Sequence, residues 1–245
     1  YRSRFVTPVH INAGVAFWQA NKDVLLKAEA EYGVPPRIVL GILGVETIYG
    51  RNTGNFRVMD ALATLAFDYP SPHPRREARI AYFRGELAQF LVLSKKLNRE
   101  PSSALGSFAG AMGLPQFMPS SWMKHAVDYD GDGQIDLLAS PTDAIGSVAH
   151  YLAEHSWQTS LPTYFDIAPP RDTSALAKLL APDILPSFSA KEMQELGARL
   201  PSVAQTHPGQ LALVQLFNGQ DAPTMIAGTA NFYAITRYNQ SSYYA

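Results

Sequence analysis

The stretch Ile38-Val39-Leu40-Gly41-Ile42-Leu43-Gly44-Val45-Glu46 is almost wholly apolar and ends on an acid. It follows Val34-Pro35-Pro36, and proline is favoured at the first position of a helix, where its missing N–H does least harm. We therefore expect a buried helix that begins at these prolines. In such a helix Ile42 and Leu43 lie one turn back, on the face that Glu46 shares.

Glu46 is the main candidate for a catalytic group. A carboxyl group held against aliphatic side chains is costly to ionise, so we expect its pKa to be raised. A carboxylic acid that is still protonated near neutral pH is what glycoside cleavage requires to protonate a leaving oxygen. The alternative is a Glu at a helix end, partly exposed or paired with Arg51, because buried acids are often merely paired.

Composition excludes several classes of protein. The chain has 245 residues, is 47% hydrophobic and 17% charged, and has a net charge of -1. This suits one large domain or one and a half smaller ones with a sizeable core, and gives no reason to expect a nucleic acid or an anionic membrane as partner. The absence of cysteine excludes disulfides and thiolate metal sites and suits an exported protein. No signal peptide heads the chain, which leaves open a processed start and a lost lipid anchor.

The first half of the chain is predicted to be helical. Asn12 is expected to cap a helix that ends at Gly33. After Pro74, apolar residues recur with a helical period as far as Leu97. Ser140-Pro141 is expected to open one more helix.

The composition changes after Trp157, where prolines become frequent. Ser189 and Glu192 form a capping-box pattern that predicts a short helix. The apolar run 211–217 followed by Asn218-Gly219 predicts a strand that enters a hairpin turn. These signals predict a small mixed subdomain.

We therefore predict an α+β protein that is mainly helical and has three parts. Residues 1–157 form a helical region with the catalytic core, 158–229 form the small accessory subdomain, and 230–245 form a return segment that completes the catalytic cleft. The segment Asn231–Asn239 is aromatic and polar together, which suits a pocket wall better than a core strand.

The segment Gly106–Trp122 contains three glycines and two prolines, which indicate an irregular backbone that can approach a ligand closely. Ser107 and Gln116 offer hydrogen bonds to such a ligand. Met112 and the apolar side chains near it offer surfaces on which sugar rings stack. The alternative is a tightly turned core loop.

Residues 128–137 match the pattern of a calcium-binding loop. Acids stand at loop positions one, three and five, a glycine stands at position six, and a further polar side chain stands at position nine. The alternation turns several hard oxygen ligands toward one point, and the glycine permits a sharp turn. The glycine and the spacing favour a metal site over a solvated acidic turn. The acids are Asp128, Asp130 and Asp132, and the glycine is Gly133.

The pattern departs from the standard loop at position twelve, where Ala139 stands in place of Glu. Asp143 is the nearest acid beyond it and comes four residues late, so the loop must be longer than standard. Asp143 has a local alternative role, because Ser140-x-x-Asp143 is itself a capping box.

Arg75 and Arg76 open the helix that follows Pro74, where positive charge is mildly unfavourable against the helix dipole. This gives them a reason to contact something anionic, although surface solvation is the simpler explanation. The histidines form no ligand spacing, and the sequence has no G-x-S-x-G motif, phosphate loop or H-E-x-x-H motif. Serine hydrolase, nucleotide-binding and zinc-protease functions therefore lack support.

Taken together, these segments resemble the lytic murein transglycosylases of the B type. The resemblance is nearly full-length, and only about 160–228 is weakly matched. It implies a lysozyme-like helical core with an EF-hand-like calcium loop. It also implies an enzyme that cleaves the MurNAc–GlcNAc β-1,4 bond of peptidoglycan without water and leaves a 1,6-anhydromuramoyl end. The matching pieces are Tyr32–Pro36, Gly44–Thr47, Asp60–Leu65, Gly106–Trp122, Asp128–Leu137, Asp143–Ala149 and Asn231–Asn239.

The resemblance also implies roles for particular residues. The single catalytic acid of the family falls on Glu46. Substrate-binding residues fall on Ser107, Gln116, Arg75, Arg76, Tyr151, Asn231, Tyr233 and Tyr238. Ligands of a structural calcium ion fall on Asp128, Asp130, Asp132, Gln134 through its backbone carbonyl, and Asp143.

No second acid is expected in a pocket-like segment, which favours a nucleophile within the substrate over the second carboxylate of ordinary glycosidases. A goose-type lysozyme and a non-catalytic, calcium-dependent glycan-binding module are the alternatives. The resemblance implies a periplasmic monomer, soluble or lipid-anchored to the outer membrane through a segment absent from this chain. It implies peptidoglycan glycan strands as substrate, cell-wall synthesis or remodelling proteins as candidate partners, and no nucleic acid.

Overall fold

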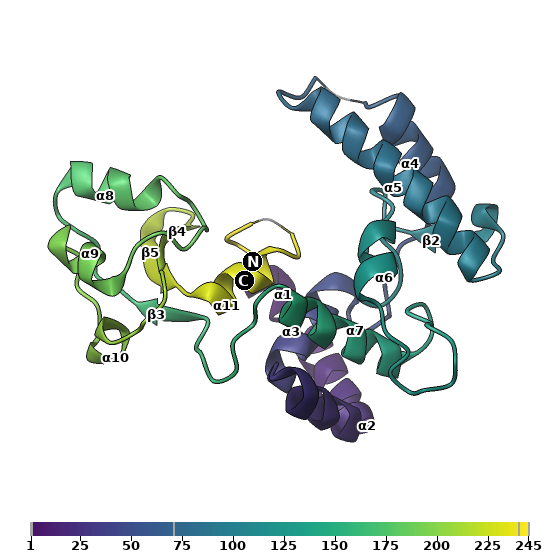
Figure 1. Ribbon diagram of the computed structural model, residues 1–245, viewed down its shortest axis with the longest axis horizontal. Helices are drawn as coiled ribbons and strands as arrows, with labels where there is room; N and C mark the ends of the chain where they lie inside the picture. Colours follow the sequence, from purple (N-terminus) through teal and green to yellow (C-terminus); the bar gives the residue numbers. More distant parts are fainter. Residues whose placement is uncertain (1, 71, 240, 245) are drawn as a thin grey trace. The chain divides into compact units, whose positions relative to one another are not determined.

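We describe the protein from a computed structural model, in which residues 2–70, 72–239 and 241–244 are placed well enough for description. The chain divides into two compact units, Tyr1–Tyr151 and Leu152–Ala245 (Figure 1). Each unit is described by itself. Tyr1, and Gln240 and Ala245 of the predicted return segment, lie outside the described residues. The predicted three-part division stays a prediction.

Among its described residues, the regular elements of the first unit are helices and one two-residue strand pair, and an isolated bridge joins Met112 and Phe117. Strand β1, Phe56–Arg57, pairs antiparallel with β2, Leu105–Gly106, so that Phe56 lies opposite Gly106. A 3-10 turn, η1, covers Pro101–Ser103. The α-helices are α1 Arg2–Phe5, α2 Pro8–Tyr32, α3 Pro36–Thr47, α4 Val58–Phe67, α5 Arg76–Lys96, α6 Pro119–His125 and α7 Pro141–Glu154, the last of which crosses the boundary between the units.

Helix α2 begins four residues before the predicted cap. Thr7 is the N-cap residue and Pro8 is the first helical residue, so the expected start at Asn12 was wrong. Threonine followed by proline is itself a strong start signal, and an exposed asparagine is tolerated inside a helix. The predicted end is confirmed, because Gly33 adopts a left-handed conformation with φ of 69°.

Helix α3 follows the prediction closely. It begins at Pro36, and Val39, Ile42 and Leu43 are all buried in the core. Beside it, the hydroxyl of Tyr49 lies where a Cβ on Gly14 or on Gly44 would stand, at 2.6 and 2.8 Å. Glycine at both positions therefore lets this ring pack between α2 and α3, and burial raises the pKa of Tyr49.

The second unit combines short helices with one antiparallel sheet. The sheet has the strand order β3-β5-β4, and β4 and β5 form a hairpin that turns at Gly219, with φ of 69°. The predicted strand and hairpin are confirmed. The strands are β3 Tyr164–Asp166, β4 Ala212–Asn218 and β5 Asp221–Gly228, and the helices are α8 Thr173–Leu180, α9 Ala190–Glu195, α10 Ser202–Gln205 and α11 Ala230–Thr236.

The predicted capping box of the second unit is present at the start of α9. The Ser189 hydroxyl accepts the N–H of Glu192, and the Glu192 carboxylate accepts the N–H of Ser189 at 2.7 Å. Buried side chains of α8, α9 and the sheet form the core of this unit, including Leu179, Met193 and Leu213. The structure thus confirms an α+β protein that is mainly helical.

Candidate active site and metal-binding loop

Glu46 is the penultimate residue of α3, and its side chain is half-buried. The chain leaves this helix through two consecutive left-handed residues, Ile48 with φ of 52° and Tyr49 with φ of 57°. A β-branched residue in this conformation is uncommon and strained, and such strain clusters at functional sites. The turn after Glu46 is thus held in a conformation that its own sequence does not favour.

Thr47 fixes the end of α3 to the glycine-containing loop. Its fully buried hydroxyl donates to the carbonyl oxygen of Leu114 at 2.8 Å and accepts the N–H of Gly50 at 3.0 Å. Because Leu114 lies within the segment 106–122, this bond sets the backbone beside Glu46 against that segment. The sequence showed Thr47 only as a neighbour of the acid, and its role was missed.

Ser107 keeps a donor available in the same loop. Its hydroxyl oxygen accepts the N–H groups of Ala109 at 3.3 Å and Ala111 at 3.0 Å. Both bonds use the oxygen, so the hydroxyl hydrogen can be donated to a ligand. The turn requires glycine at Gly110, where φ is 87° and a Cβ would stand 2.5 Å from the Leu62 side chain.

Gln116 also combines a structural contact with a remaining hydrogen-bonding atom. Its Nε2 donates to the carbonyl oxygens of Thr53 at 3.0 Å and Gly113 at 2.9 Å. Its Oε1 makes no hydrogen bond with any residue that the structure describes, and can accept one from a hydroxyl. Met112 is only 3% exposed, which leaves a small surface for a sugar ring. The substrate roles of Gln116 and Met112 stay predictions.

Tyr151 packs against the same part of the first unit. The residue is 7% exposed, and its ring centroid lies 5.6 Å from that of Phe117 and 4.9 Å from that of His125.

The two predicted arginines, Arg75 and Arg76, differ from each other in their contacts. The guanidinium of Arg75 makes no hydrogen bond or ion pair within the described ranges, and that of Arg76 lies 3.4 Å from the Glu77 carboxylate at the surface.

Three predicted substrate residues, Asn231, Tyr233 and Tyr238, belong to the second unit. Asn231 is fully buried and uses both ends of its amide, accepting from the N–H of Gln158 at 2.7 Å and donating to the carbonyls of Gln158 and Leu161 at 2.8 Å each. The Arg237 guanidinium lies 5.7 Å over the Tyr233 ring. The Tyr238 ring stacks on Tyr244 with a 5° interplanar angle. Their substrate roles stay predictions.

Residues 128–143, here called the aspartate loop, bring several carboxylates together as a cation-binding site would. Oxygen atoms of Asp128, Asp130 and Asp143 all lie within 4.8 Å of one another. Asp132 and Gln134 are exposed, and the Asp132 carboxylate accepts the N–H of Gln134 at 2.8 Å. An all-oxygen donor set with several carboxylates fits a hard cation such as calcium.

Asp143 belongs to this loop more than to its own helix. The carboxylate is 1% exposed and accepts the N–H groups of Tyr129 and Asp136, each at 2.8 Å. Only half of the predicted capping box forms, in which the Ser140 hydroxyl accepts the N–H of Asp143 at 3.1 Å. The buried carboxylate therefore lies beside Asp128 and Asp130, where it can take the place of the missing acid at position twelve, and its role as a metal ligand stays a prediction.

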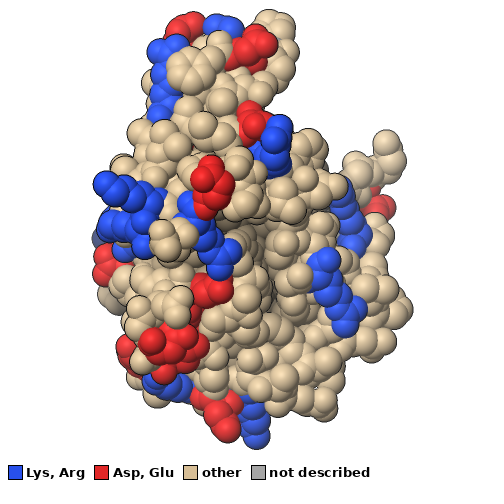
Figure 2. Space-filling model, turned by 90° about the vertical axis from the view of Figure 1, so that its right-hand side faces the viewer, with Lys and Arg blue, Asp and Glu red and all other residues tan. Residues whose placement is uncertain are grey.

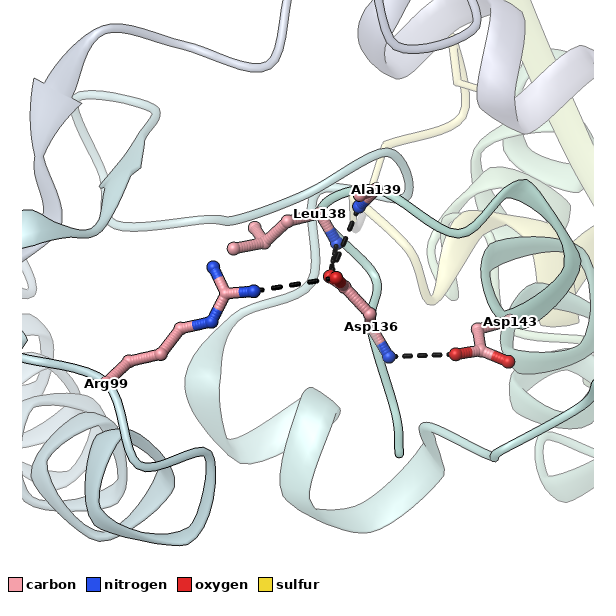
Figure 3. A network of polar contacts seen from close by, with 5 residues as sticks. All are labelled: Arg99, Asp136, Leu138, Ala139 and Asp143. Carbon is pink, nitrogen blue, oxygen red and sulfur yellow. Dashed lines mark hydrogen bonds and ion pairs between the residues drawn. The ribbon is translucent and has the colours of Figure 1, made fainter. Parts of the chain in front are cut away.

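Asp136 explains how the longer loop reaches Asp143. Its carboxylate accepts the N–H groups of Leu138 at 2.9 Å and Ala139 at 3.2 Å, and the Arg99 guanidinium lies 3.5 Å away. Figure 3 shows these contacts around Asp136. This turn delays the start of α7 until its first turn can present Asp143 to the loop. The sequence pattern marked Asp136 only as a side chain at position nine.

Tyr129 anchors the loop to two helices. Its ring occupies the space where a Cβ on Gly146 of α7 would stand, only 2.2 Å from Cγ. Its hydroxyl donates to the Glu31 carboxylate at 3.0 Å, and the Lys27 ammonium group lies 4.2 Å over the ring. Burial and this bond to Glu31 raise the pKa of Tyr129. Burial, followed by the hydrogen bond and charge of Glu31, also raises the pKa of Tyr32 to about 12.

The aspartate loop and the loop beside Glu46 are hydrogen-bonded to each other. The N–H of Leu114 donates to the carbonyl of Leu137 at 2.8 Å, and a Cβ on Gly113 would stand 2.4 Å from the same carbonyl oxygen. Leu114 in turn accepts from Thr47. One continuous set of contacts therefore runs from the aspartate loop to the helix end that carries Glu46.

Glu86 is a buried acid that sequence reasoning missed. It is 3% exposed on α5, and its carboxylate accepts the Ser120 hydroxyl at 2.6 Å and the Ser120 N–H at 2.9 Å. These bonds make it a cap for the start of α6. Its position three residues after Phe83 and four before Phe90, on the same apolar face, was the available signal.

Comparison with known proteins shows extensive similarity. The pattern of the transglycosylase SLT domain family matches residues 1–245. The chain is 42% identical to membrane-bound lytic murein transglycosylase B of Escherichia coli (strain K12) over 248 residues, covering 100% of this chain and 63% of that protein. This chain thus spans less than two thirds of the length of that relative.

Two solved structures are similar over the whole chain. The soluble lytic transglycosylase SltB1 of Pseudomonas aeruginosa is 44% identical, with a TM-score of 0.86 and coverage of 77% of its chain. The Escherichia coli lytic transglycosylase Slt35, solved in complex with calcium, is 40% identical, with a TM-score of 0.84 and coverage of 73%. These neighbours confirm the predicted lysozyme-like core. Within the described ranges, no helix has the length and apolar character needed to cross a membrane.

Proposed function

Because this chain belongs to the transglycosylase SLT domain family, we propose that it acts as a lytic transglycosylase on peptidoglycan. It cleaves the MurNAc–GlcNAc β-1,4 bond and leaves a 1,6-anhydroMurNAc end. The observation that carries this proposal is the match of 100% of the chain to a lytic murein transglycosylase, with Glu46 at the end of a buried helix.

In the proposed mechanism Glu46 acts twice. The protonated carboxyl donates its proton to the glycosidic oxygen as the bond to the MurNAc C1 breaks. The positive charge that develops at C1 is stabilised by the carbonyl of the substrate's own N-acetyl group. The Glu46 carboxylate then removes the proton of the MurNAc C6 hydroxyl, whose oxygen attacks C1. The sugar supplies its own nucleophile at high effective concentration, so one carboxyl group is sufficient.

The neighbouring loop supplies groups that suit this chemistry. The Ser107 hydroxyl hydrogen and the Gln116 Oε1 are one donor and one acceptor, from a segment that Thr47 holds against the end of α3. We assign to both, and to Met112, the recognition of the sugars on either side of the cleaved bond. We also assign substrate contacts to Arg75, Arg76, Tyr151, Asn231, Tyr233 and Tyr238.

We propose that the aspartate loop binds calcium, the ion with which Slt35 was solved in complex. Asp128, Asp130, Asp132 and Asp143 and the carbonyl of Gln134 would hold the ion, which would offset the repulsion between the clustered carboxylates. The loop would act on the site through the bond between Leu137 and Leu114. It therefore has a structural role and takes no part in bond breaking.

The remaining assignments follow from the same proposal. Peptidoglycan glycan strands are the substrate, and cell-wall synthesis or remodelling proteins are candidate partners. We place the protein in the periplasm as a monomer, free or anchored to the outer membrane through a segment outside this chain. Within it, residues 1–157 carry the catalytic acid, 158–229 form the accessory subdomain and 230–245 return to the cleft.

Mass spectrometry of muropeptides after digestion of purified peptidoglycan tests the proposal. A transglycosylase gives products whose sugar end is one water molecule lighter than the product of hydrolysis. Products with a free reducing end would make the protein a lysozyme. Binding without any product would make it a glycan-binding module.

A further inference from the structure

The first unit contains a cavity of about 450 Å³ that the mechanism does not use. It lies between the last turn of α5, helix α6 and the second half of the aspartate loop. Among the predicted site residues only Gln134 lines it. A volume of this size is within the range of small-molecule sites. Figure 2 views the side on which α5 and α6 lie in Figure 1, and basic and acidic side chains lie close together on this face.

The charges around the cavity favour an anion. Lys96 and Arg99 line it, against one carboxylate, Asp136. Asp136 already accepts two backbone N–H groups and lies 3.5 Å from Arg99. The Lys96 ammonium group makes no hydrogen bond or ion pair within the described ranges, so it is available to a carboxylate.

The rest of the lining favours a short aliphatic chain with peptide groups. Leu97 and Met123 are partly exposed apolar side chains, and Asn98 and Gln134 each offer an amide donor and acceptor. Trp122 also lines the cavity, but it is 3% exposed and presents almost no ring face on which a sugar could stack. Its indole N–H is buried without a hydrogen-bond partner among the described residues. Such an unsatisfied donor is costly, and its NMR signal should respond to changes in the packing around Trp122 when the cavity is filled.

We propose that this cavity binds a short aliphatic peptide through its terminal carboxylate, and that the natural ligand is the peptide stem of peptidoglycan. Lys96 contacts the carboxylate, the amides of Asn98 and Gln134 contact peptide groups, and Leu97 and Met123 contact methyl side chains. The identity of the natural ligand rests on the proposed function, whereas the preference for a carboxylate-bearing peptide does not. The protein would thus bind stem peptides at a site separate from the one that binds the sugars being cleaved.

The test is a titration of the whole chain, with calcium present, with N-acetyl-D-alanyl-D-alanine and with its C-terminal amide. Binding is followed by NMR on the Trp122 indole N–H signal, which is assigned by its loss in Trp122→Phe. We expect a saturable shift with the free acid and at least about tenfold weaker binding of the amide, because the charged hydrogen bond is lost. Chitobiose, which has the sugar linkage but no carboxylate, should leave the signal unchanged.

A pair of neighbouring lysines provides the matched variants. Lys95 and Lys96 are both exposed in the last turn of α5, but only Lys96 lines the cavity. Lys96→Gln should weaken binding of the acid about threefold to tenfold and leave binding of the amide unchanged. Lys95→Gln should match the unaltered protein with both ligands.

Three results would overturn the inference. They are an unmoved Trp122 signal, equal affinities for acid and amide, and equal effects of the two lysine variants. None of these results depends on turnover. Failure of this inference is therefore distinguishable from failure of the proposed function, which would be seen in the muropeptide masses of the same preparation.

Discussion

The loop beside Glu46, residues 106–118, and the aspartate loop, residues 128–143, are neighbours in the sequence but are held by different chemistry. The first depends on neutral hydrogen bonds, such as those of Thr47 and Ser107, and on glycines that fit against backbone atoms. The second depends on carboxylates that accept backbone N–H groups, above all Asp143. The first loop should therefore tolerate a change of ionic conditions, whereas the second requires positive charge to balance its acids.

The largest expected effect is that of Glu46→Gln, which should lower activity without lowering stability. Glu46→Gln should lower turnover of peptidoglycan by about 10²–10⁴-fold, because general acid catalysis is lost together with the later proton removal. The melting temperature should stay the same. Glu29→Gln, the same change at a half-exposed acid near the end of α2, is the control and should retain full activity. Activity of Glu46→Gln above about a tenth of the unaltered level would contradict a role of Glu46 in bond breaking.

Asp143→Asn tests the charged loop. The amide keeps the shape of the carboxylate but can accept only one of the two N–H groups, leaving a buried donor unsatisfied at a cost of about 1–3 kcal/mol. Calcium should raise the melting temperature of the unaltered protein, because a ligand of the native state stabilises it by mass action. The variant should show little or no rise.

Asp23→Asn on the exposed face of α2 is the control and should keep the full calcium response. Scanning calorimetry with calcium and with a chelator provides the measurement. Identical curves for the unaltered protein under both conditions would exclude calcium as a stabilising ligand.

Thr47→Val tests the neutral loop. Valine has nearly the same shape but removes the bonds to the Leu114 carbonyl and the Gly50 N–H, at about 0.5–1.5 kcal/mol each. We expect a lower melting temperature, lower turnover and an unchanged calcium response. Thr64→Val, on the exposed side of α4, should alter none of the three. Loss of the calcium response in Thr47→Val would show that the two loops are not separable.

The smallest effect concerns a carboxylate that accepts N–H groups in water. The hydrogen bonds of Ser189 hold the pKa of Glu192 below its ordinary value. The stability that this contributes is present above the unfolded pKa and is lost as pH falls through the lower folded pKa. Ser189→Ala should raise the pKa of Glu192, measured by NMR titration, and should lower the melting temperature slightly. A shift in the melting temperature as large as that of Asp143→Asn would contradict the distinction between buried and exposed carboxylates.

The sequence predicted elements where one local signal dominates. Proline and a sustained apolar run located α3, and the Asn218-Gly219 pair located the β4–β5 hairpin. The beginning of α2 was predicted wrongly because Thr7 and Asn12 could each cap a helix, and the N-cap residue is Thr7. Contacts between distant residues could not be predicted, because neither the bond between Thr47 and Leu114 nor that between Glu86 and Ser120 has a local pattern.

The candidate site, too, could be predicted from the sequence only where a local pattern determines it. The spacing of the aspartates predicted that Asp128, Asp130 and Asp132 lie together, and Asp143 was added as the nearest acid beyond position twelve and by family resemblance. The observed cluster contains Asp128, Asp130 and Asp143. The spacing did not predict how the loop accommodates its extra residues, because that depends on the bonds of Asp136 to its own neighbours. The substrate residues of the second unit came from family resemblance and not from any local physical signal.

The left-handed turn at Ile48 and Tyr49 has a consequence for laboratory evolution. Glycine or asparagine adopts this conformation more readily than isoleucine, so a library selected only for heat resistance should accumulate them at position 48. The same replacements would loosen the backbone that follows Glu46. A library selected for lysis of cell walls should retain isoleucine, and the two selections would diverge at this position first.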